Sequence, residues 1–170
     1  MASGDARLTL TPQPLTAAAF APFGDVIESD GRDHFTINDG YAERFHNLAD
    51  IDLTEQNGKP LVSIFQARPR PRPIEVAMME RHPLSSQAFI PLSEVPFLVL
   101  VAPAGEPPTV NDLVLFRTNG RHGVNFARGV WHFPLLVEQE NQRFLVVDRG
   151  GPEQNCDLHY FDASALADIP

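Results

Sequence analysis

Residues 123–134, GVNFARGVWHFP, decide the fold of this chain. Gly129 permits a backbone with positive φ just before a strand, and every second residue from Trp131 to Val137 is apolar. His132 lies on the other face of that strand, among further apolar residues. A strand that is apolar on both faces belongs inside a barrel or sandwich. Because an unpaired buried polar group costs roughly 1–3 kcal/mol, His132 is either a core residue bonded to backbone or part of a site.

The composition is that of a globular protein. Its 170 residues suit one domain, residues 1–170, and 43% of them are hydrophobic. The net charge of −9 argues against binding to nucleic acid or to an anionic membrane, which both favour a basic surface. Cys156 is the only cysteine, which is consistent with a reducing compartment. There is no signal-peptide pattern, and no apolar run long enough to span a bilayer. We therefore expect a cytoplasmic protein.

Frequent prolines and glycines divide the chain into short segments, which favours strands over long helices. Two short helices are expected, at residues 17–20 after a capping Thr16 and at residues 164–167. The other segments follow one another at about ten residues, which is typical of an antiparallel barrel or sandwich. Two of them, 76–81 and 88–92, are expected to pair. The expected strands are residues 61–66, 76–81, 88–92, 97–101, 131–137, 144–147 and 158–161.

Arginine and proline alternate from Arg68 to Pro73, which imposes an extended, polyproline-like path. Such a segment suits a ligand for a proline-recognition domain or a clamp for an anion. A short compositional bias is weak evidence for either function. We interpret the segment as a stiff, solvated connection between two strands.

A cluster of polar residues at 80–87 is the second candidate for a functional site. Glu80 and His82 are two apart, so on a strand both point to the same face. Gln87 follows after a short turn, and His132 comes from a distant strand. Together these four residues suit acid–base chemistry or a site for Mn, Fe, Ni or Zn. The alternative is that Glu80 is solvated and His82 caps the turn.

Three further polar sites stand near turns. Arg149, followed by two glycines, can bind a carboxylate or can belong to a turn. Asn38 begins the turn signal Asn-Asp-Gly, and Arg44 and His46 then share a face if that segment is a strand. The remaining histidines, at positions 34, 122 and 159, are expected to be solvated.

Seven short blocks are distributed over nearly the whole chain. In order they are AFAPFGDVI at 19–27, INDG at 37–40, ERHP at 80–83, SQAFIP at 86–91, GVN at 123–125, GVWH at 129–132 and DRGG at 148–151. Their order and spacing resemble the ureidoglycolate lyase family of allantoin degradation. The resemblance implies a mainly all-β fold, a cupin-like antiparallel β-barrel or jelly roll with one or two short helices. It also implies a homodimer.

The resemblance implies removal of urea from ureidoglycolate to leave glyoxylate, a step of purine catabolism. In the wider cupin pattern, metal-binding histidines occupy the positions of Glu80 and His82. Gln87 stands near the position of a glutamate, and His132 ends the second motif. With two histidines, one glutamate and one glutamine, a divalent metal is expected to bind weakly. Nickel is the metal that the resemblance implies.

The implied reaction needs a base for the hydroxyl proton, an acid or polarising group for the leaving nitrogen, and a cation for the carboxylate. Two other functions stay open: another cupin activity on a small carboxylic acid, as a metal-dependent isomerase or oxygenase, and non-enzymatic binding of a small molecule. The residues assigned are His132, His82 and Glu80 as catalytic groups, Arg149, Arg44, Asn38 and Gln87 as substrate-binding groups, and His82, His132, Gln87 and Glu80 as metal ligands.

Overall fold

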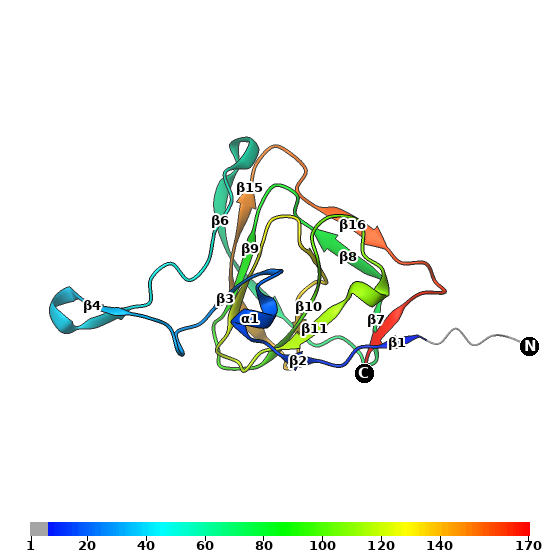
Figure 1. Cartoon of the computed structure of the whole chain (residues 1–170), viewed down its shortest axis with the longest axis horizontal. Helices are drawn as coiled ribbons and strands as arrows, with labels where there is room; N and C mark the ends of the chain where they lie inside the picture. Colours follow the sequence, from blue (N-terminus) through cyan, green and yellow to red (C-terminus); the bar gives the residue numbers. More distant parts are fainter. Residues whose placement is uncertain (1–6) are drawn as a thin grey trace, which may run out of the picture.

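Two large β-sheets that share a hydrophobic core form the body of the protein (Figure 1). The computed structural model describes residues 7–170. Strands dominate these residues, so the prediction of a mainly all-β, cupin-like fold is confirmed. None of the helices in this range is long and apolar enough to cross a membrane.

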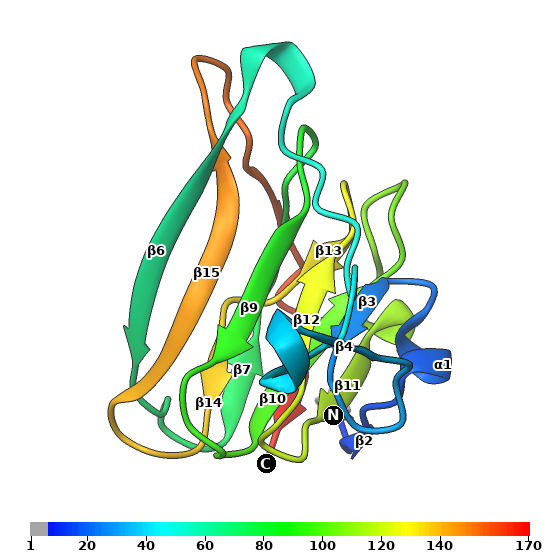
Figure 2. The ribbon, with the colours of Figure 1, turned by 90° about the vertical axis from the view of Figure 1, so that its left-hand side faces the viewer.

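The five-stranded sheet is antiparallel throughout and forms one side of the body (Figure 2). Its last strand, β6, is an edge strand that pairs only with β15. In spatial order the strands are β3 (Gly24–Ile27), β12 (Gly123–Phe126), β9 (Gln87–Pro91), β15 (Gln142–Gly150) and β6 (Lys59–Ala67).

The seven-stranded sheet faces it and carries most of the candidate site. Its pairs are antiparallel except for the short parallel pair of β11 with β2. In spatial order the strands are β16 (Asp157–Tyr160), β8 (Met78–Arg81), β13 (Trp131–His132), β10 (Phe97–Ala102), β11 (Val114–Arg117) and β2 (Gln13–Pro14), with β14 (Leu136–Val137) also paired to β10.

Two smaller sheets complete the strands. One of them covers the far side of the seven-stranded sheet, and the other is a hairpin that stands away from the body (Figure 1). The three-stranded sheet is β1 (Leu8–Thr9), β17 (Ala167–Ile169) and β7 (Ile74–Val76), and the hairpin is β4 (Phe35–Ile37) and β5 (Ala42–Arg44).

One of the two expected helices is present. α1 (Ala17–Phe20) begins at Thr16, whose hydroxyl accepts a hydrogen bond from the backbone N–H of Ala19. The helix expected at residues 164–167 is wrong, because β17 begins at Ala167 and pairs with β7. Sheet pairing outweighs the weak helix propensity of four residues. The 3₁₀ turns are η1 (Asn38–Gly40), η2 (Glu55–Asn57) and η3 (Val110–Asp112).

Strand β10 separates two hydrophobic clusters. Side chains alternate along a strand, so residues 97, 99 and 101 pack between the two large sheets while residues 98, 100 and 102 pack toward β7 and β17. Every residue of β10 is buried. The prediction of a fully buried strand here is confirmed, and both faces of the seven-stranded sheet are apolar at its centre.

The single strand expected over residues 131–137 is interrupted. β13 and β14 both pair with β10, but residues 133–135 lie opposite only two residues of β10, which makes a β-bulge. The extra residue reverses the alternation: Trp131 and Leu136 pack in one cluster, whereas Val137 packs in the other. The expectation that Trp131 and Val137 share a face is therefore wrong. The positive φ expected at Gly129 is present, at 76°.

The hairpin expected from residues 76–81 and 88–92 is also wrong. β8 pairs with β13 and β16, whereas β9 pairs with β12 and β15 in the other large sheet. Residues 82–86 cross from one sheet to the other. This crossing brings Gln87 to His82 across the interior. The arginine–proline segment connects β6 to β7, which confirms that it joins two strands.

Candidate active site

His132 lies on β13 with its imidazole between the two large sheets. Phe126 stacks on the ring, with centroids 4.4 Å apart and planes at 6°. The Nδ1 atom lies 3.1 Å from the carbonyl oxygen of Val130, and because a carbonyl only accepts, Nδ1 carries the proton. A neutral ring then presents Nε2 as an acceptor. Among the described residues this buried atom has no hydrogen-bond partner.

Glu80 of β8 lies directly opposite His132 in the register of the sheet. Its Oε1 atom is 3.4 Å from His132 Nε2. Two lone pairs repel one another at this separation, so the pair is favourable only with a proton or a metal cation between the two atoms. The arrangement can therefore take up a proton from a bound molecule or hold a cation.

The carboxyl group of Glu80 is ionised at neutral pH. Burial is the largest influence on its pKa and acts to raise it. The protonated forms of His132 and His82 and a weak bond from the Cys156 thiol together outweigh burial and lower the pKa of Glu80. The site thus keeps one full negative charge beside two imidazoles.

His82 follows β8 immediately, and its ring centroid lies 5.0 Å from that of His132. The two histidines therefore lie side by side, although His82 is not among the residues that line the cavity described below. The Nδ1 atom of His82 is 2.7 Å from the backbone oxygen of Asn155, and its Nε2 atom is 3.0 Å from Oε1 of Gln87. Both ring nitrogens are thus engaged, in contrast to those of His132.

The side-chain amide of Gln87 decides the protonation of His82. Its NH₂ group donates to Oδ2 of Asp148 at 3.1 Å, which leaves Oε1 turned toward His82. The backbone oxygen of Asn155 is likewise only an acceptor. Both ring nitrogens of His82 thus face acceptors, an arrangement that favours the doubly protonated ring. In that form His82 is an imidazolium beside the Glu80 carboxylate.

From the sequence no role was assigned to Asp148, which holds the Gln87 side chain. Asp148 lies on β15, where Phe144 and Val146 point into the core. The two-residue period of a strand places Asp148 on the same inner face. The alternation along 144–148 was therefore a signal that could have found it.

Asn155 is a second missed residue. Its Oδ1 accepts from the backbone N–H of Leu84, and its NH₂ group donates to the hydroxyl of Ser85, both at 2.7 Å. With its backbone oxygen on His82, Asn155 holds the whole crossing segment in place. No local pattern in the sequence marks this residue, because its partners lie about 70 positions away.

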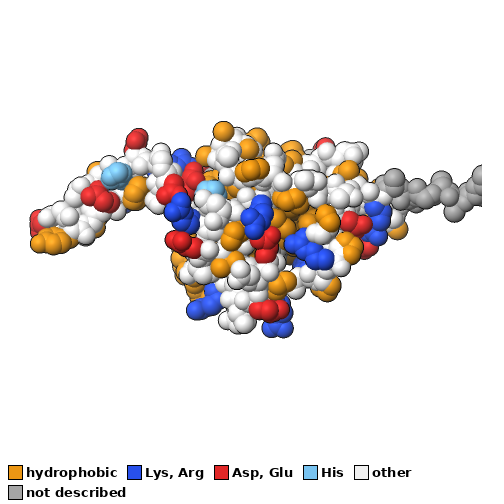
Figure 3. Space-filling view, turned by 90° about the horizontal axis from the view of Figure 1, so that it is seen from below, with side chains coloured by type: hydrophobic (Ala, Val, Ile, Leu, Met, Phe, Trp, Pro, Cys, Tyr) orange, Lys and Arg blue, Asp and Glu red, His pale blue; other side chains and the backbone are white. Residues whose placement is uncertain are grey.

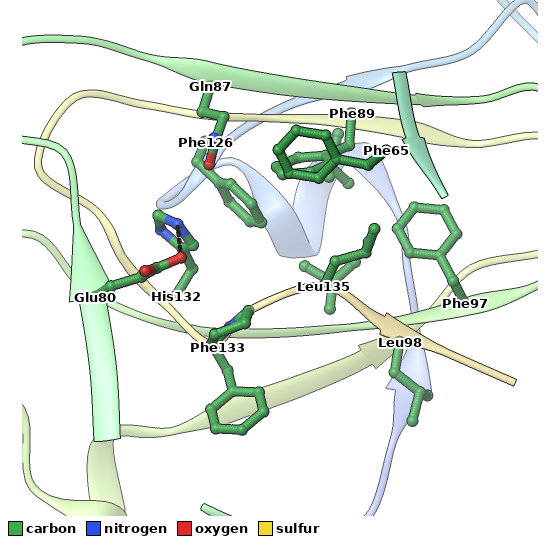
Figure 4. A pocket seen from close by; sticks show the side chains of 13 residues that line it. Phe65, Glu80, Gln87, Phe89, Phe97, Leu98, Phe126, His132, Phe133 and Leu135 are labelled. Carbon is green, nitrogen blue, oxygen red and sulfur yellow. Dashed lines mark ion pairs between the residues drawn. The ribbon is translucent and has the colours of Figure 1, made fainter. Parts of the chain in front are cut away.

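A cavity of about 100 Å³ lies in front of these groups (Figure 4). This is several times the space that one water molecule needs. Glu80, Gln87 and His132 form its polar end, and Glu80 and His132 point toward one another. Neither lysine nor arginine is among the described residues that line it. The apolar remainder is formed by Phe65, Phe89, Phe97, Leu98, Val99, Val124, Phe126, Phe133, Pro134 and Leu135.

The structure does not bring the other expected substrate-binding residues to this cavity within one chain. Arg149 lies on the face of β15 opposite to Asp148, and its guanidinium donates to the backbone oxygens of Glu55 and Gln56. It therefore anchors η2. Asn38 and Arg44 belong to the hairpin that stands away from the body (Figure 1).

Comparison with known proteins agrees with this geometry. A model of the ureidoglycolate lyase family matches residues 7–168. The chain belongs to the ureidoglycolate lyase family. A ureidoglycolate lyase of Pseudomonas syringae pv. tomato is 54% identical over 154 residues, which cover 91% of each chain. Ureidoglycolate lyases of Pseudomonas putida strain W619 and Pseudomonas entomophila are each 56% identical over 153 residues, 90% of this chain and 92% of theirs.

Membership of the ureidoglycolate lyase family confirms the resemblance carried by the short blocks, and it places the chain among enzymes of the lyase class. The donor set can also be tested against the divalent metal expected for this family member. One ligand atom from each of Glu80, His82 and His132 lies within 4.8 Å of the other two. The unpartnered Nε2 of His132 carries the lone pair that a cation would bind. These residues fit a divalent metal.

Proposed function

We propose that this chain is a ureidoglycolate lyase, which eliminates urea from ureidoglycolate and leaves glyoxylate, a step of allantoin and purine catabolism. The observation that carries the proposal is the buried, unpartnered Nε2 of His132 at the polar end of a small cavity. The family match and the names of relatives at 54–56% identity support the substrate.

In net terms the proposed reaction moves one proton from oxygen to nitrogen and breaks the carbon–nitrogen bond. Two groups of the enzyme carry out the two proton transfers, and exchange with solvent then returns both groups to their starting states. The hydroxyl of ureidoglycolate loses its proton, the carbon–oxygen bond becomes a carbonyl, and the carbon–nitrogen bond breaks with its electron pair going to nitrogen. That nitrogen takes up a proton and leaves as urea. A base near the hydroxyl and an acid near the nitrogen are therefore required.

His132 is the proposed base. Its Nδ1 is anchored to the carbonyl of Val130, which fixes the tautomer and leaves Nε2 to receive the hydroxyl proton. The imidazolium that forms is stabilised by the ionised Glu80, whose Oε1 lies 3.4 Å from Nε2. Glu80 thus supports the base electrostatically.

His82 is the proposed acid. Its protons on both nitrogens follow from the carbonyl oxygens of Asn155 and Gln87 that face them. A ureido group that replaces the Gln87 amide at His82 Nε2 would receive the proton there. Asp148 holds the Gln87 side chain and so controls this exchange.

In a metal-bound form the proposed ligands are Glu80, His82 and His132, with the Gln87 oxygen beside His82. The two imidazoles then act as ligands in place of the base and acid roles given above. When bound, a divalent metal, nickel in this proposal, would supply Lewis-acid polarisation of the substrate oxygens. Binding requires that His82 gives up a proton. With one anionic ligand among neutral ones, the site is proposed to exchange its metal readily.

The proposed enzyme is a single-domain, cytoplasmic homodimer. The nine-residue edge strand β6 supports the dimer, because native proteins cover or blunt such edges. The single cysteine supports a reducing compartment. Light scattering over a wide range of concentration is expected to give the dimer mass, and a monomer mass throughout would contradict it.

The function is tested by incubating the purified chain with ureidoglycolate, with and without a chelator, while urea and glyoxylate are measured together. Equal amounts of the two products are expected. Release of ammonia in place of urea would show hydrolysis of the ureido group instead of elimination. The His132→Ala variant, which lacks the proposed base, is the control for background decomposition.

A further inference from the structure

The outer face of the five-stranded sheet is apolar and uncovered near its edge. Val62 of β6 is paired with Val147 of β15, and Ile64 with Leu145, all on the face that points away from the core. Val62 is 70% exposed and Ile64 is 49% exposed. Ile90 of β9 continues the second row. A flat apolar face beside an open edge strand is a surface that a partner covers.

The β4–β5 hairpin stands out from the body on the side of this same sheet (Figure 2). We call residues 33–47 the arm. The main contacts of its strands are with each other and with η1, and an isolated two-stranded hairpin is only marginally stable in water. Its aromatic side chains are turned to solvent, with Phe35 50% and Tyr41 92% exposed. Figure 3 shows the arm as a separate projection that bears hydrophobic and acidic groups.

The arm and the β6 region carry opposite charges. The arm holds Asp33, Asp39 and Glu43 against Arg44, a net charge of −2 with histidines neutral. Residues 59–73 hold one lysine and three arginines and no acidic residue, a net charge of +4. None of these four cations forms an ion pair with an acidic side chain among the described residues, and Arg72 donates a hydrogen bond to the backbone oxygen of Pro170. A positive segment in a chain of net charge −9 attracts an acidic partner, and the arm of another copy is one.

We propose that a second copy of this chain covers this face and that its arm crosses β6 to bring Arg44 to the mouth of the cavity. The inference rests on the proposed function and deepens it, because it makes the partner's Arg44 the cation for the substrate carboxylate. In a two-fold dimer each copy gives its arm to the other. The arginine–proline segment then receives the acidic arm.

The cavity needs such a cation, and no arginine of the described residues lines it. Arg70 lies over the ring of Phe133, 5.0 Å from its centroid, and three other arginines have partners elsewhere. Arg81 is paired with Asp157, Arg128 with Asp52, and Arg149 with backbone oxygens. The side chain of Arg44 has no hydrogen-bond or ion-pair partner within residues 7–170. A guanidinium and a carboxylate form two parallel hydrogen bonds.

The cavity extends to the edge that the arm would cross. Phe65 lines the cavity from the edge strand β6 and is still 39% exposed, so this side chain reaches both the cavity and the surface. Adjacent strands lie about 4.8 Å apart, so the path from β9 across β15 to the free edge of β6 is about 10 Å. The arm has five residues before its turn at 38–40 and seven after it, so its shorter side spans about 17 Å when extended.

Subunit complementation tests the inference. Arg44→Ala and His132→Ala chains with different affinity tags are produced together, and the mixed dimers are isolated through both tags. In a mixed dimer the chain that keeps His132 receives Arg44 from its partner, so one site of two is complete. We expect each parent homodimer to lose activity, by about 10- to 100-fold in kcat/KM for Arg44→Ala. The mixed dimer should recover about half of the wild-type activity.

A mixed dimer that stays at the level of its parents overturns the inference, as does an Arg44→Ala homodimer with wild-type kcat/KM. If His132→Ala does not fold, Glu80→Gln takes its place in the same cross. Wild-type protein that releases no urea and glyoxylate would instead refute the proposed function, so the two failures are distinguishable.

The proposal that a second copy covers the outer face of the five-stranded sheet can also be tested without measuring activity. Val62→Asp is expected to shift the mass in light scattering from dimer to monomer. Leu158→Asp is the matched control, because Leu158 is 49% exposed on β16 in the other large sheet. If Val62→Asp stays dimeric, or Leu158→Asp also dissociates, the proposed face is wrong.

Discussion

Two histidines of this protein, the buried His132 and the partly buried His122, each lie beside a glutamate and have one ring nitrogen without a hydrogen-bond partner among the described residues. The free atom of His132 is Nε2, which faces both Glu80 and the cavity. The free atom of His122 is Nδ1, and its Nε2 lies 3.0 Å from Glu28. The expectation of a solvated His122 is wrong, since its side chain is only 12% exposed.

The two histidine–glutamate pairs differ most in the other groups that contact each glutamate. Arg32 also bonds Glu28, at 3.2 Å, so that carboxylate has a permanent cation. Glu80 has no ion pair with lysine or arginine in residues 7–170, and its neighbours are two imidazoles and the Cys156 thiol. Protons on those groups can be exchanged. The comparison indicates that a histidine–glutamate pair whose glutamate also binds an arginine is structural. A pair whose glutamate is surrounded by titratable groups can exchange protons.

Removing each imidazole in turn is the strongest test of the difference between His132 and His122. His132→Ala is expected to lower kcat/KM by about 10³-fold or more while the protein stays folded, because it removes the base. His122→Ala should keep activity within about twofold and lose about 1–3 kcal/mol of stability. Steady-state kinetics and denaturant unfolding measure both. A folded His132→Ala variant with near-normal turnover would make His132 a core residue.

Metal binding should separate the two pairs next. Equilibrium dialysis against Ni²⁺ is expected to show binding to wild type and to His122→Ala but none to His132→Ala, since only the Glu80 pair lacks a fixed cation. Chelation should lower activity yet shift Tm by less than about 2 °C, because the two apolar clusters hold the sheets. A large fall in Tm on chelation would mean that the metal holds the fold together.

The two glutamates can be compared by pH. The folded-state pKa of Glu80 is lowered from its ordinary 4.5, so its ionised form adds stability above that value and loses it as the pH falls through the lowered pKa. The difference in unfolding midpoint between wild type and Glu80→Gln should stay constant near neutrality and shrink only below pH 4.5. Glu28→Gln is the control that should leave turnover intact. A difference that already shrinks above pH 5 would contradict the assignment.

The smallest expected effect concerns the thiol beside Glu80. Burial first, and then the charge of Glu80, raise the pKa of Cys156 above its ordinary value. Alkylation by iodoacetamide near neutral pH should therefore be slower than for a free thiol. Glu80→Gln should speed it a few-fold, whereas Glu28→Gln should not. Equal rates in the two variants would place the Glu80 charge too far from Cys156 to matter.

Local pattern was sufficient for several parts of the molecule. The apolar run at 97–101 predicted a strand buried on both faces, and Thr16 predicted a helix start. The two-residue spacing of Glu80 and His82 placed them on one face, where both meet His132. These features depend on side-chain alternation and capping, which operate within a few residues of the chain.

Other features of the site depended on pairing between distant segments. The sequence alone determined that this is a strand-rich member of its family in which Glu80, His82 and His132 lie close together. Only the tertiary structure decided that β8 and β9 enter different sheets, that Asp148 and Asn155 set the state of His82, and that Arg149 turns away. The physical reason is that strand partners are chosen by long-range packing and register, whereas a short segment records only its own periodicity.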